Sequence, residues 1–149
     1  MKLFIKLPME YTPNEGSHSI IAAGEHNGIL FYICSIGGLH PTAYIRIPKG
    51  MPLHGLDYDD IEQYEIDVHG GWTYAGPGLK GVVNDDESWF IGWDYSHYCD
   101  FEGFYLRYKS DDRLNECKKW TTDEIVSECQ HVCEEIAALN ECTNIRSNT

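Results

Sequence analysis

The alternation of apolar and polar positions predicts strands in the first third of the chain. Two apolar runs, Ser19–Ala23 and Ile29–Ile36, flank a segment that ends in Asn27-Gly28. An Asn-Gly dipeptide between two such runs is a strong signal for a β-hairpin. A third run, Thr42–Ile47, follows and stops at Pro48. Together these segments predict an antiparallel meander.

The pattern changes in the middle of the chain. Residues 48–63 are rich in Gly, Pro and Asp, which predicts a long loop with one short helical turn. Tyr64–His69 alternates polar and apolar residues, as a half-buried strand does. The glycine-rich residues 70–81 predict a mobile connection. Ser88–Trp93 and Gly103–Tyr108 predict two further strands.

One helix is predicted, over residues 122–140. Thr121 and Glu124 have the spacing of a capping box, which marks a helix start. An apolar stripe then repeats at the helical period, made of Ile125, Cys129, Val132, Ile136 and Leu139, with Val126, Cys133 and Ala137 beside it. The fold class is therefore α+β: a curved antiparallel β-sheet with a C-terminal amphipathic helix packed on one face. We expect one domain over residues 1–142 and a polar C-terminal tail over 143–149.

The charge distribution bears on the partners of the protein. The formal net charge is −13, and the stretch from Asp57 to Glu102 holds twelve acids and one base, Lys80. A direct nucleic-acid reader normally carries a basic stripe, so we expect no direct contact with nucleic acid. A dense acidic surface suits a bound cation, a basic protein partner or solubility alone.

The apolar segments are too short for a secretory signal or a membrane span. Met1–Met9 is interrupted by two lysines and a proline, and no stretch reaches the length that a span needs. We therefore expect a cytoplasmic protein with no membrane partner, in which the six cysteines remain thiols. Cys129 and Cys133 lie four residues apart, which predicts that both are buried on one helix face. A homo-oligomer stays open.

The candidate chemistry lies in residues 67–76 and 89–100, where a predicted strand passes into a polar turn in each case. Asp94, His97 and Asp100 recur every three residues, and His69 precedes a Gly-Gly pair. Two imidazoles and two carboxylates suit a divalent metal such as zinc or manganese. Without a metal, a histidine serves as general base and a carboxylate orients it.

The residues of this hypothesis fall into three groups. The predicted catalytic residues are His69, Asp94 and His97. The predicted metal ligands are His69, Asp94, His97 and Asp100. The predicted ligand-binding residues are Gly70, Gly71, Trp72, Thr73, Tyr74 and Trp93. The alternatives are a structural, hydrogen-bonded His69, a helix-capping Asp94 before a short helix at Tyr95, and tryptophans that belong to the core.

These two stretches carry a resemblance. His69-Gly-Gly-Trp-Thr-Tyr-Ala-Gly76 and Trp89-Phe-Ile-Gly-Trp-Asp-Tyr-Ser-His-Tyr-Cys-Asp100 resemble a family of small, mostly uncharacterised proteins of bacteriophages and prophages. Ile45–Pro48 and Pro52–Tyr58 fit the same pattern. The resemblance implies a phage setting, in which small accessory proteins counter host defence or redirect host enzymes inside the bacterial cytosol.

Three functions follow from these expectations. The favoured role is that of a phage-encoded counter-defence protein with a ligand pocket around the two histidines and two aspartates, and whether it is an enzyme or a binder stays open. The first function is accordingly a metal-assisted hydrolase of a nucleotide-like or phosphoester ligand. The second is a non-enzymatic acidic inhibitor that mimics nucleic acid on a host defence protein. The third is a sequestering protein that binds a small signalling nucleotide without cleaving it.

Overall fold

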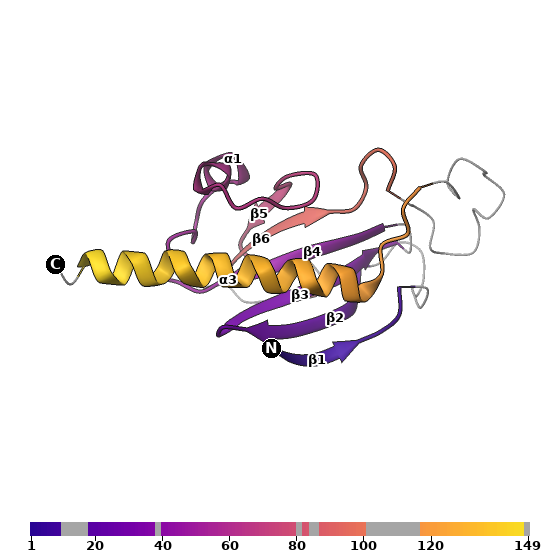
Figure 1. Cartoon of the computed structure of the whole chain (residues 1–149), viewed down its shortest axis with the longest axis horizontal. Helices are drawn as coiled ribbons and strands as arrows, with labels where there is room; N and C mark the ends of the chain where they lie inside the picture. The colour runs from indigo at the N-terminus through magenta and orange to yellow at the C-terminus, as the bar shows by residue number, and fades with distance from the viewer. Residues whose placement is uncertain (10–17, 38–39, 80–81, 84–86, 101–116, 148–149) are drawn as a thin grey trace.

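The fold is an open six-stranded antiparallel sheet with one long helix across it, as the computed structural model shows (Figure 1). The structure describes residues 1–9, 18–37, 40–79, 82–83, 87–100 and 117–147, with side chains up to residue 141. The strand order is β1-β2-β3-β4-β6-β5. The strands are β1 Lys2–Lys6, β2 His18–His26, β3 Ile29–Ile36, β4 His40–Ile47, β5 Tyr74–Gly76 and β6 Trp89–Asp94, and the helices are α1 Tyr58–Ile61, η1 Glu62–Tyr64 and α3 Thr122–Ser147. The predicted α+β class is confirmed.

The predicted hairpin forms between β2 and β3. His26 pairs with Ile29, and Asn27 and Gly28 connect them with φ angles of 52° and 79°. Two positive φ values in a two-residue loop match the twist of antiparallel strands, and Asn and Gly adopt them at the lowest cost. The dipeptide therefore fixes the register of the central strands.

The strands bury side chains on both faces of the sheet. On the face beneath α3, Phe31, Ile45 and Trp93 belong to the main core, which is continuous with the buried stripe of the helix. Successive side chains of a strand point to opposite faces, so residues that alternate with these along the strands, such as Tyr44 and Phe90, form a smaller cluster on the other face. A strand buried on both faces explains why the apolar runs in the sequence are nearly continuous.

Helix α3 covers one face as predicted, and contacts β2, β3 and β4. Thr121 and Glu124 form the expected capping box: the Glu124 amide donates to Thr121 Oγ1 at 3.2 Å, and the Thr121 amide donates to Glu124 Oε1 at 3.1 Å. Cys129 and Cys133 are both fully buried, which confirms their predicted position. The helix runs to Ser147, so most of the expected polar tail is helical.

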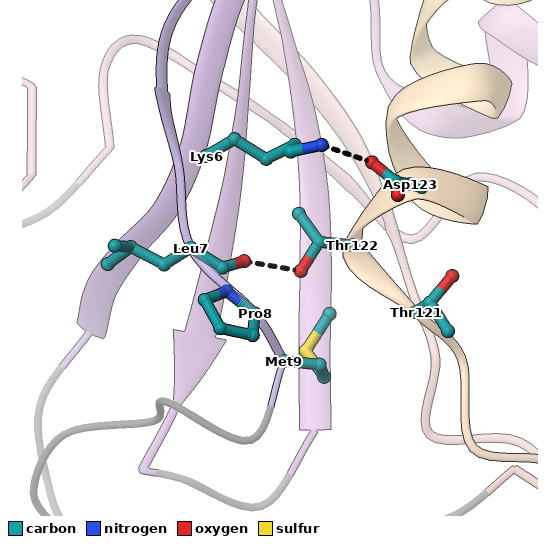
Figure 2. Close-up of a pocket in the computed structure, with 7 residues that line it drawn as sticks. All are labelled: Lys6, Leu7, Pro8, Met9, Thr121, Thr122 and Asp123. Atoms are coloured by element: carbon teal, nitrogen blue, oxygen red, sulfur yellow. Dashed lines mark hydrogen bonds and ion pairs between the residues drawn. The ribbon is translucent and has the colours of Figure 1, made fainter.

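The beginning of α3 is attached to the end of β1. Lys6 pairs with Asp123 at 2.7 Å, and the Thr122 hydroxyl donates to the Leu7 carbonyl at 2.6 Å. These residues, with Pro8, Met9 and Thr121, line a cavity of about 300 Å³ (Figure 2). Lys6 and Asp123 are the ionisable side chains of its lining, and they neutralise each other.

Of the strands expected from the sequence, one is not formed and one lies outside the described residues. Residues 64–69 are not a strand: η1 ends at Tyr64, Glu65 takes the left-handed conformation at φ 57°, and the following residues are coil. Ile66 and Val68 alternate because both pack against the main core, not because they lie in the sheet. The short strands β1 and β5 were not predicted, and the predicted strand at 103–108 lies outside the described residues.

Two general expectations meet plain findings. Among the described residues, no helix is both long enough and apolar enough to cross a membrane. The five cysteines with described side chains are thiols outside any disulfide bond: Cys34, Cys99, Cys117, Cys129 and Cys133.

Candidate functional site

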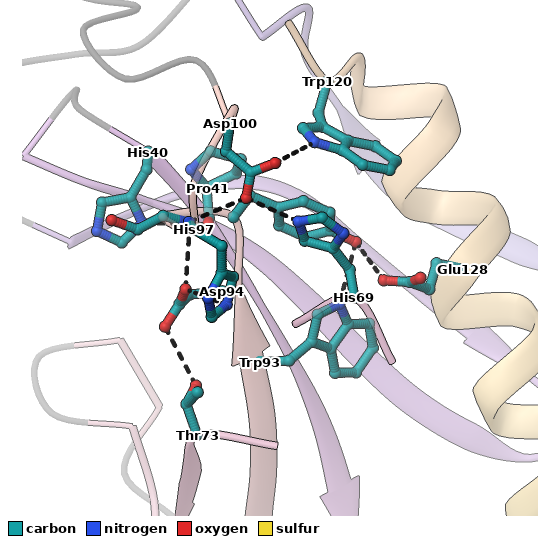
Figure 3. A network of polar contacts seen from close by, with 12 residues as sticks. His40, Pro41, His69, Thr73, Trp93, Asp94, His97, Asp100, Trp120 and Glu128 are labelled. Atoms are coloured by element: carbon teal, nitrogen blue, oxygen red, sulfur yellow. Dashed lines mark hydrogen bonds and ion pairs between the residues drawn. The ribbon is translucent and has the colours of Figure 1, made fainter. Parts of the chain in front are cut away.

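The structure brings the two predicted stretches together beside the start of α3. Asp94 ends β6, His97 and Asp100 lie in the turn that follows it, and His69 comes from the loop before β5 (Figure 3). The rings of His69 and His97 lie 5.6 Å apart between centroids, edge to face at 74°. All four side chains expected to converge therefore do so.

His69 and Asp100 form a buried pair. His69 Nε2 donates to Asp100 Oδ2 at 2.7 Å, and the Asp100 side chain is only 3% exposed. The same carboxylate accepts two more hydrogen bonds, from the His97 amide at 3.0 Å and from Trp120 Nε1 at 2.9 Å. Burial alone would raise the pKa of Asp100, but the bonds from His69, Trp120 and the His97 amide outweigh it, and the pKa is lowered.

His97 and Asp94 form a second, looser pair. His97 Nε2 lies 3.1 Å from Asp94 Oδ1 but is out of line for a hydrogen bond, and it has no hydrogen-bond partner among the described residues. The Asp94 carboxylate instead accepts from the Thr73 hydroxyl at 3.2 Å and from the Ser96 amide at 3.1 Å. Asp94 thus closes a turn at Ser96, and no helix begins at Tyr95.

The two glycines after His69 have separate reasons to be glycine. Gly70 and Gly71 have φ angles of 70° and 87°, which side chains rarely adopt. At Gly70 a Cβ would also lie 2.1 Å from His97 Nε2, because the imidazole lies directly against the backbone there. At Gly71 the nearest atom to a Cβ would be 4.0 Å away. Gly70 therefore makes room for His97, whereas Gly71 serves the turn alone.

An aromatic frame holds the His69 ring. Tyr95 stacks on it at 4.9 Å and 7°, and Trp120 packs against it at 4.7 Å. The Tyr95 hydroxyl donates to Glu128 of α3 at 2.5 Å and accepts from Trp93 Nε1 at 3.0 Å. Burial, with Glu128 as the next cause, raises the pKa of Tyr95 strongly, so the phenol stays neutral. The frame ties the site loops to the helix.

Sequence reasoning missed three members of this site: Trp120, Tyr95 as a ring partner, and Glu128. Trp120 directly precedes the capping box of α3, but nothing in its spacing connects it to Asp100, 20 residues away. Glu128 lies outside the apolar stripe of the predicted helix, so the sequence pattern places it on the solvent-facing side. A half-buried Glu opposite a buried Tyr hydroxyl becomes visible only in three dimensions.

The predicted ligand-binding residues divide. Thr73 and Gly70 contact the site through Asp94 and His97. Trp72 and Trp93 are 4% and 0% exposed and pack edge to face within the core, which is the alternative that the sequence left open for them. Their indole rings fill space between the sheet and the loop, and the Trp72 N–H donates to Ile66 O at 2.9 Å.

Tyr74 also belongs elsewhere. Its ring packs on Tyr44 in the smaller cluster, and its hydroxyl donates to the Gly78 carbonyl at 2.6 Å. Leu79 packs into the same cluster. The described part of the glycine-rich segment therefore covers that cluster after Tyr74 and does not close over the histidines.

The site does not have the arrangement of a metal centre. Each imidazole faces its own carboxylate, and no group of three or more His, Cys, Asp or Glu side chains within the described ranges could hold a metal ion. Zinc and manganese sites need such convergence at bond lengths of about 2 Å. The predicted metal site over His69, Asp94, His97 and Asp100 therefore does not fit this geometry.

In each imidazole, Nδ1 is the nitrogen that does not face the carboxylate. Nε2 faces a carboxylate in both rings, and within the described part of the chain Nδ1 of neither ring has a hydrogen bond. The His69 and His97 side chains remain 24% and 34% exposed. Two part-exposed histidines side by side, each beside a carboxylate, are suited to proton transfer.

Comparisons with known proteins add no relative: no protein-family model, no curated protein and no solved structure matches this chain.

Proposed function

We propose that this protein is a phage-encoded accessory enzyme that cleaves a phosphoester in a nucleotide-like ligand by histidine acid–base catalysis. The observation that carries the proposal is the His69–Asp100 pair with His97 beside it, 5.6 Å away between ring centroids. The phage setting and the counter-defence role rest on the sequence resemblance alone.

The chemistry assigned to the pair follows from its hydrogen bonds. Asp100 holds Nε2–H of His69, which fixes the tautomer with its lone pair on Nδ1. That lone pair is the general base. When it takes a proton, the buried carboxylate stabilises the imidazolium, which is the role a carboxylate plays in catalytic triads.

His97 is assigned the complementary role. Its looser contact with Asp94 and its greater exposure suit a group that gives a proton to a leaving oxygen. The rings of the two histidines meet edge to face, so a base and an acid lie on neighbouring elements. Acid–base groups of this kind contribute about 10²–10⁴-fold each to a rate.

A panel of phosphoesters tests the proposal: bis(p-nitrophenyl) phosphate, p-nitrophenyl phosphate and the dinucleotide UpA. We expect cleavage of at least one by the wild-type protein, with a loss of about 100-fold or more in kcat in His69→Ala and in His97→Ala. His131→Ala is the matched control, because His131 pairs with Glu135 at 2.9 Å on the exposed side of α3. An inactive wild type, or equal activity in all variants, would contradict the proposal.

A second candidate is a non-enzymatic acidic inhibitor, favoured by one observation. The acids Asp57, Asp59, Asp60, Glu62, Glu65 and Asp67 are all exposed, and Tyr58 and Tyr64 among them are 44% and 39% exposed. Tyrosines are enriched in protein interfaces, and a surface of one charge sign attracts a partner of the opposite sign. Binding to a basic host protein should weaken strongly between low and physiological salt; binding that ignores salt would remove this candidate.

A further inference from the structure

We infer that the substrate is a ribonucleotide phosphodiester whose own 2′-hydroxyl is the attacking nucleophile. This inference rests on the proposed function and narrows it. Three features of the site carry it: the engagement of its hydroxyl groups, the pairing of its histidines and its charge.

Two described hydroxyl groups of the site, those of Thr73 and Tyr95, are already engaged. Thr73 donates to Asp94 at 3.2 Å, and the fully buried Tyr95 donates to Glu128 at 2.5 Å. The exposed thiol of Cys99 has no hydrogen bond to either imidazole in the described part of the chain. A covalent mechanism needs a nucleophile within hydrogen-bond reach of its base. None of these three described groups has that geometry, which favours water or part of the ligand as the nucleophile.

Reactivity favours the ligand over water. Unassisted phosphoester hydrolysis is among the slowest reactions that enzymes accelerate. The described residues offer no metal centre to activate water, only two imidazoles. A neighbouring hydroxyl in the same molecule removes much of the barrier, since effective molarities reach about 10⁵–10⁸ M. Acid–base catalysis of about 10²–10⁴-fold per group then suffices.

Charge favours a diester over a monoester. The site holds the carboxylates of Asp94 and Asp100, and the ammonium group of Lys118, which lies over the Trp120 ring, is paired with Glu124 at 2.7 Å. A phosphodiester carries one negative charge, and a phosphomonoester carries nearly two at neutral pH. The singly charged ligand suffers less repulsion from the carboxylates.

The reaction balances without a co-reactant. His69 Nδ1 takes the proton of the 2′-hydroxyl while the 2′-oxygen bonds to phosphorus. The bond between phosphorus and the 5′-oxygen breaks, and that oxygen receives the Nδ1 proton of His97. The products are a 2′,3′-cyclic phosphate and a free 5′-hydroxyl. Proton exchange with solvent returns both imidazoles to their starting forms.

The experiment compares UpA with 2′-deoxyuridylyl-adenosine and with bis(p-nitrophenyl) phosphate, which lacks a neighbouring hydroxyl. We expect cleavage of UpA to a 2′,3′-cyclic phosphate, seen by ³¹P NMR, and at least a 1,000-fold slower reaction of both other diesters. His131→Ala should cleave UpA like the wild type, whereas His69→Ala and His97→Ala should not.

The outcomes separate this inference from the proposed function. Cleavage of the deoxy dinucleotide or of bis(p-nitrophenyl) phosphate at a rate similar to UpA would overturn the inference, because water would then be the nucleophile. The acid–base hydrolase would still stand. No cleavage of any phosphoester in the panel would overturn both. Cleavage of UpA that survives in the two site variants would assign the reaction to a contaminating nuclease and overturn both as well.

Discussion

The two histidine–carboxylate pairs contain the same groups but are held differently. The Asp100 side chain is 3% exposed and accepts from His69, from Trp120 and from a backbone amide. The Asp94 side chain is 25% exposed, and the His97 nitrogen beside it is out of line for a hydrogen bond. The His69–Asp100 pair is fixed by hydrogen bonds that join three segments of the chain. The His97–Asp94 pair is a looser contact beside it.

The difference follows from where each carboxylate lies. Asp100 lies between the turn after β6, the loop that carries His69 and the residue before α3, so three donors reach it at once. Asp94 is the last residue of β6, and it accepts hydrogen bonds from the Ser96 amide of its own turn and from the Thr73 hydroxyl. We therefore expect changes at Asp100 to affect the fold and the chemistry together, and changes at Asp94 to affect the chemistry alone.

The largest expected effect is that of Asp100→Asn. The amide group cannot accept from all three donors, and at least one buried donor loses its partner. Breaking a buried charged hydrogen-bond network costs about 2–4 kcal/mol. Asp94→Asn should cost less than about 1 kcal/mol, because its partners reach solvent. Urea unfolding of both variants measures this, and equal destabilisation would contradict the contrast between the pairs.

The acid dependence of stability sharpens the same contrast. The pKa of Asp100 in the folded protein lies below its ordinary value of 3.8. Its contribution is therefore fully present above that value and is lost as the pH falls through the lowered folded pKa. Between pH 5 and 2, Asp100→Asn should lose less stability than the wild type does, as urea unfolding at each pH measures.

Gly70→Ala comes next, and it tests the looser pair. Gly55→Ala is the control, because Gly55 also has a positive φ, 83°, but has nothing within 4 Å of a Cβ. Both variants should lose about 1–2 kcal/mol from the left-handed backbone. Only Gly70→Ala should displace His97, with a fall of about 100-fold in kcat, since misplacing a catalytic group by about 1 Å has that effect. Equal kcat in the two variants would show that His97 is not catalytic.

How much of this could be predicted from the sequence depends on the range of the interaction. The Asn27-Gly28 turn, the capping box at Thr121 and the stripe of α3 are local patterns, and each was predicted with its residues. The convergence of His69 with Asp100 was predicted from two strand ends, but only Asp100 follows a strand, since His69 lies in a turn before β5. The two residues meet as predicted, although half of the reasoning behind the prediction was wrong.

The remaining features depend on partners distant in the chain. Ile66 and Val68 show the alternation of a strand. Both pack against the core, but they lie in coil and pair with no strand. Trp72 and Trp93 look like pocket walls beside carboxylates, and only the packing of one ring on the other reveals core residues. The four predicted metal ligands form two separate pairs, and the His97 nitrogen is out of line for a hydrogen bond with Asp94. The spacing of these residues in the sequence encodes neither feature.

The smallest expected effect, that of Trp120→Phe, isolates one donor of the fixed pair. Phenylalanine keeps an aromatic ring beside His69 but removes the N–H that donates to Asp100. Trp89→Phe is the control, since the Trp89 indole is also half-buried and donates to a backbone carbonyl, that of Leu56, at 2.8 Å. Each variant should lose about 1 kcal/mol of stability. Only Trp120→Phe should raise the pKa of Asp100 toward its ordinary 3.8, because the Trp120 bond is one of the causes that lower it. A ¹³C NMR titration of the carboxyl carbons measures this, and an Asp100 pKa that stays the same in both variants would remove Trp120 from the network that orients His69.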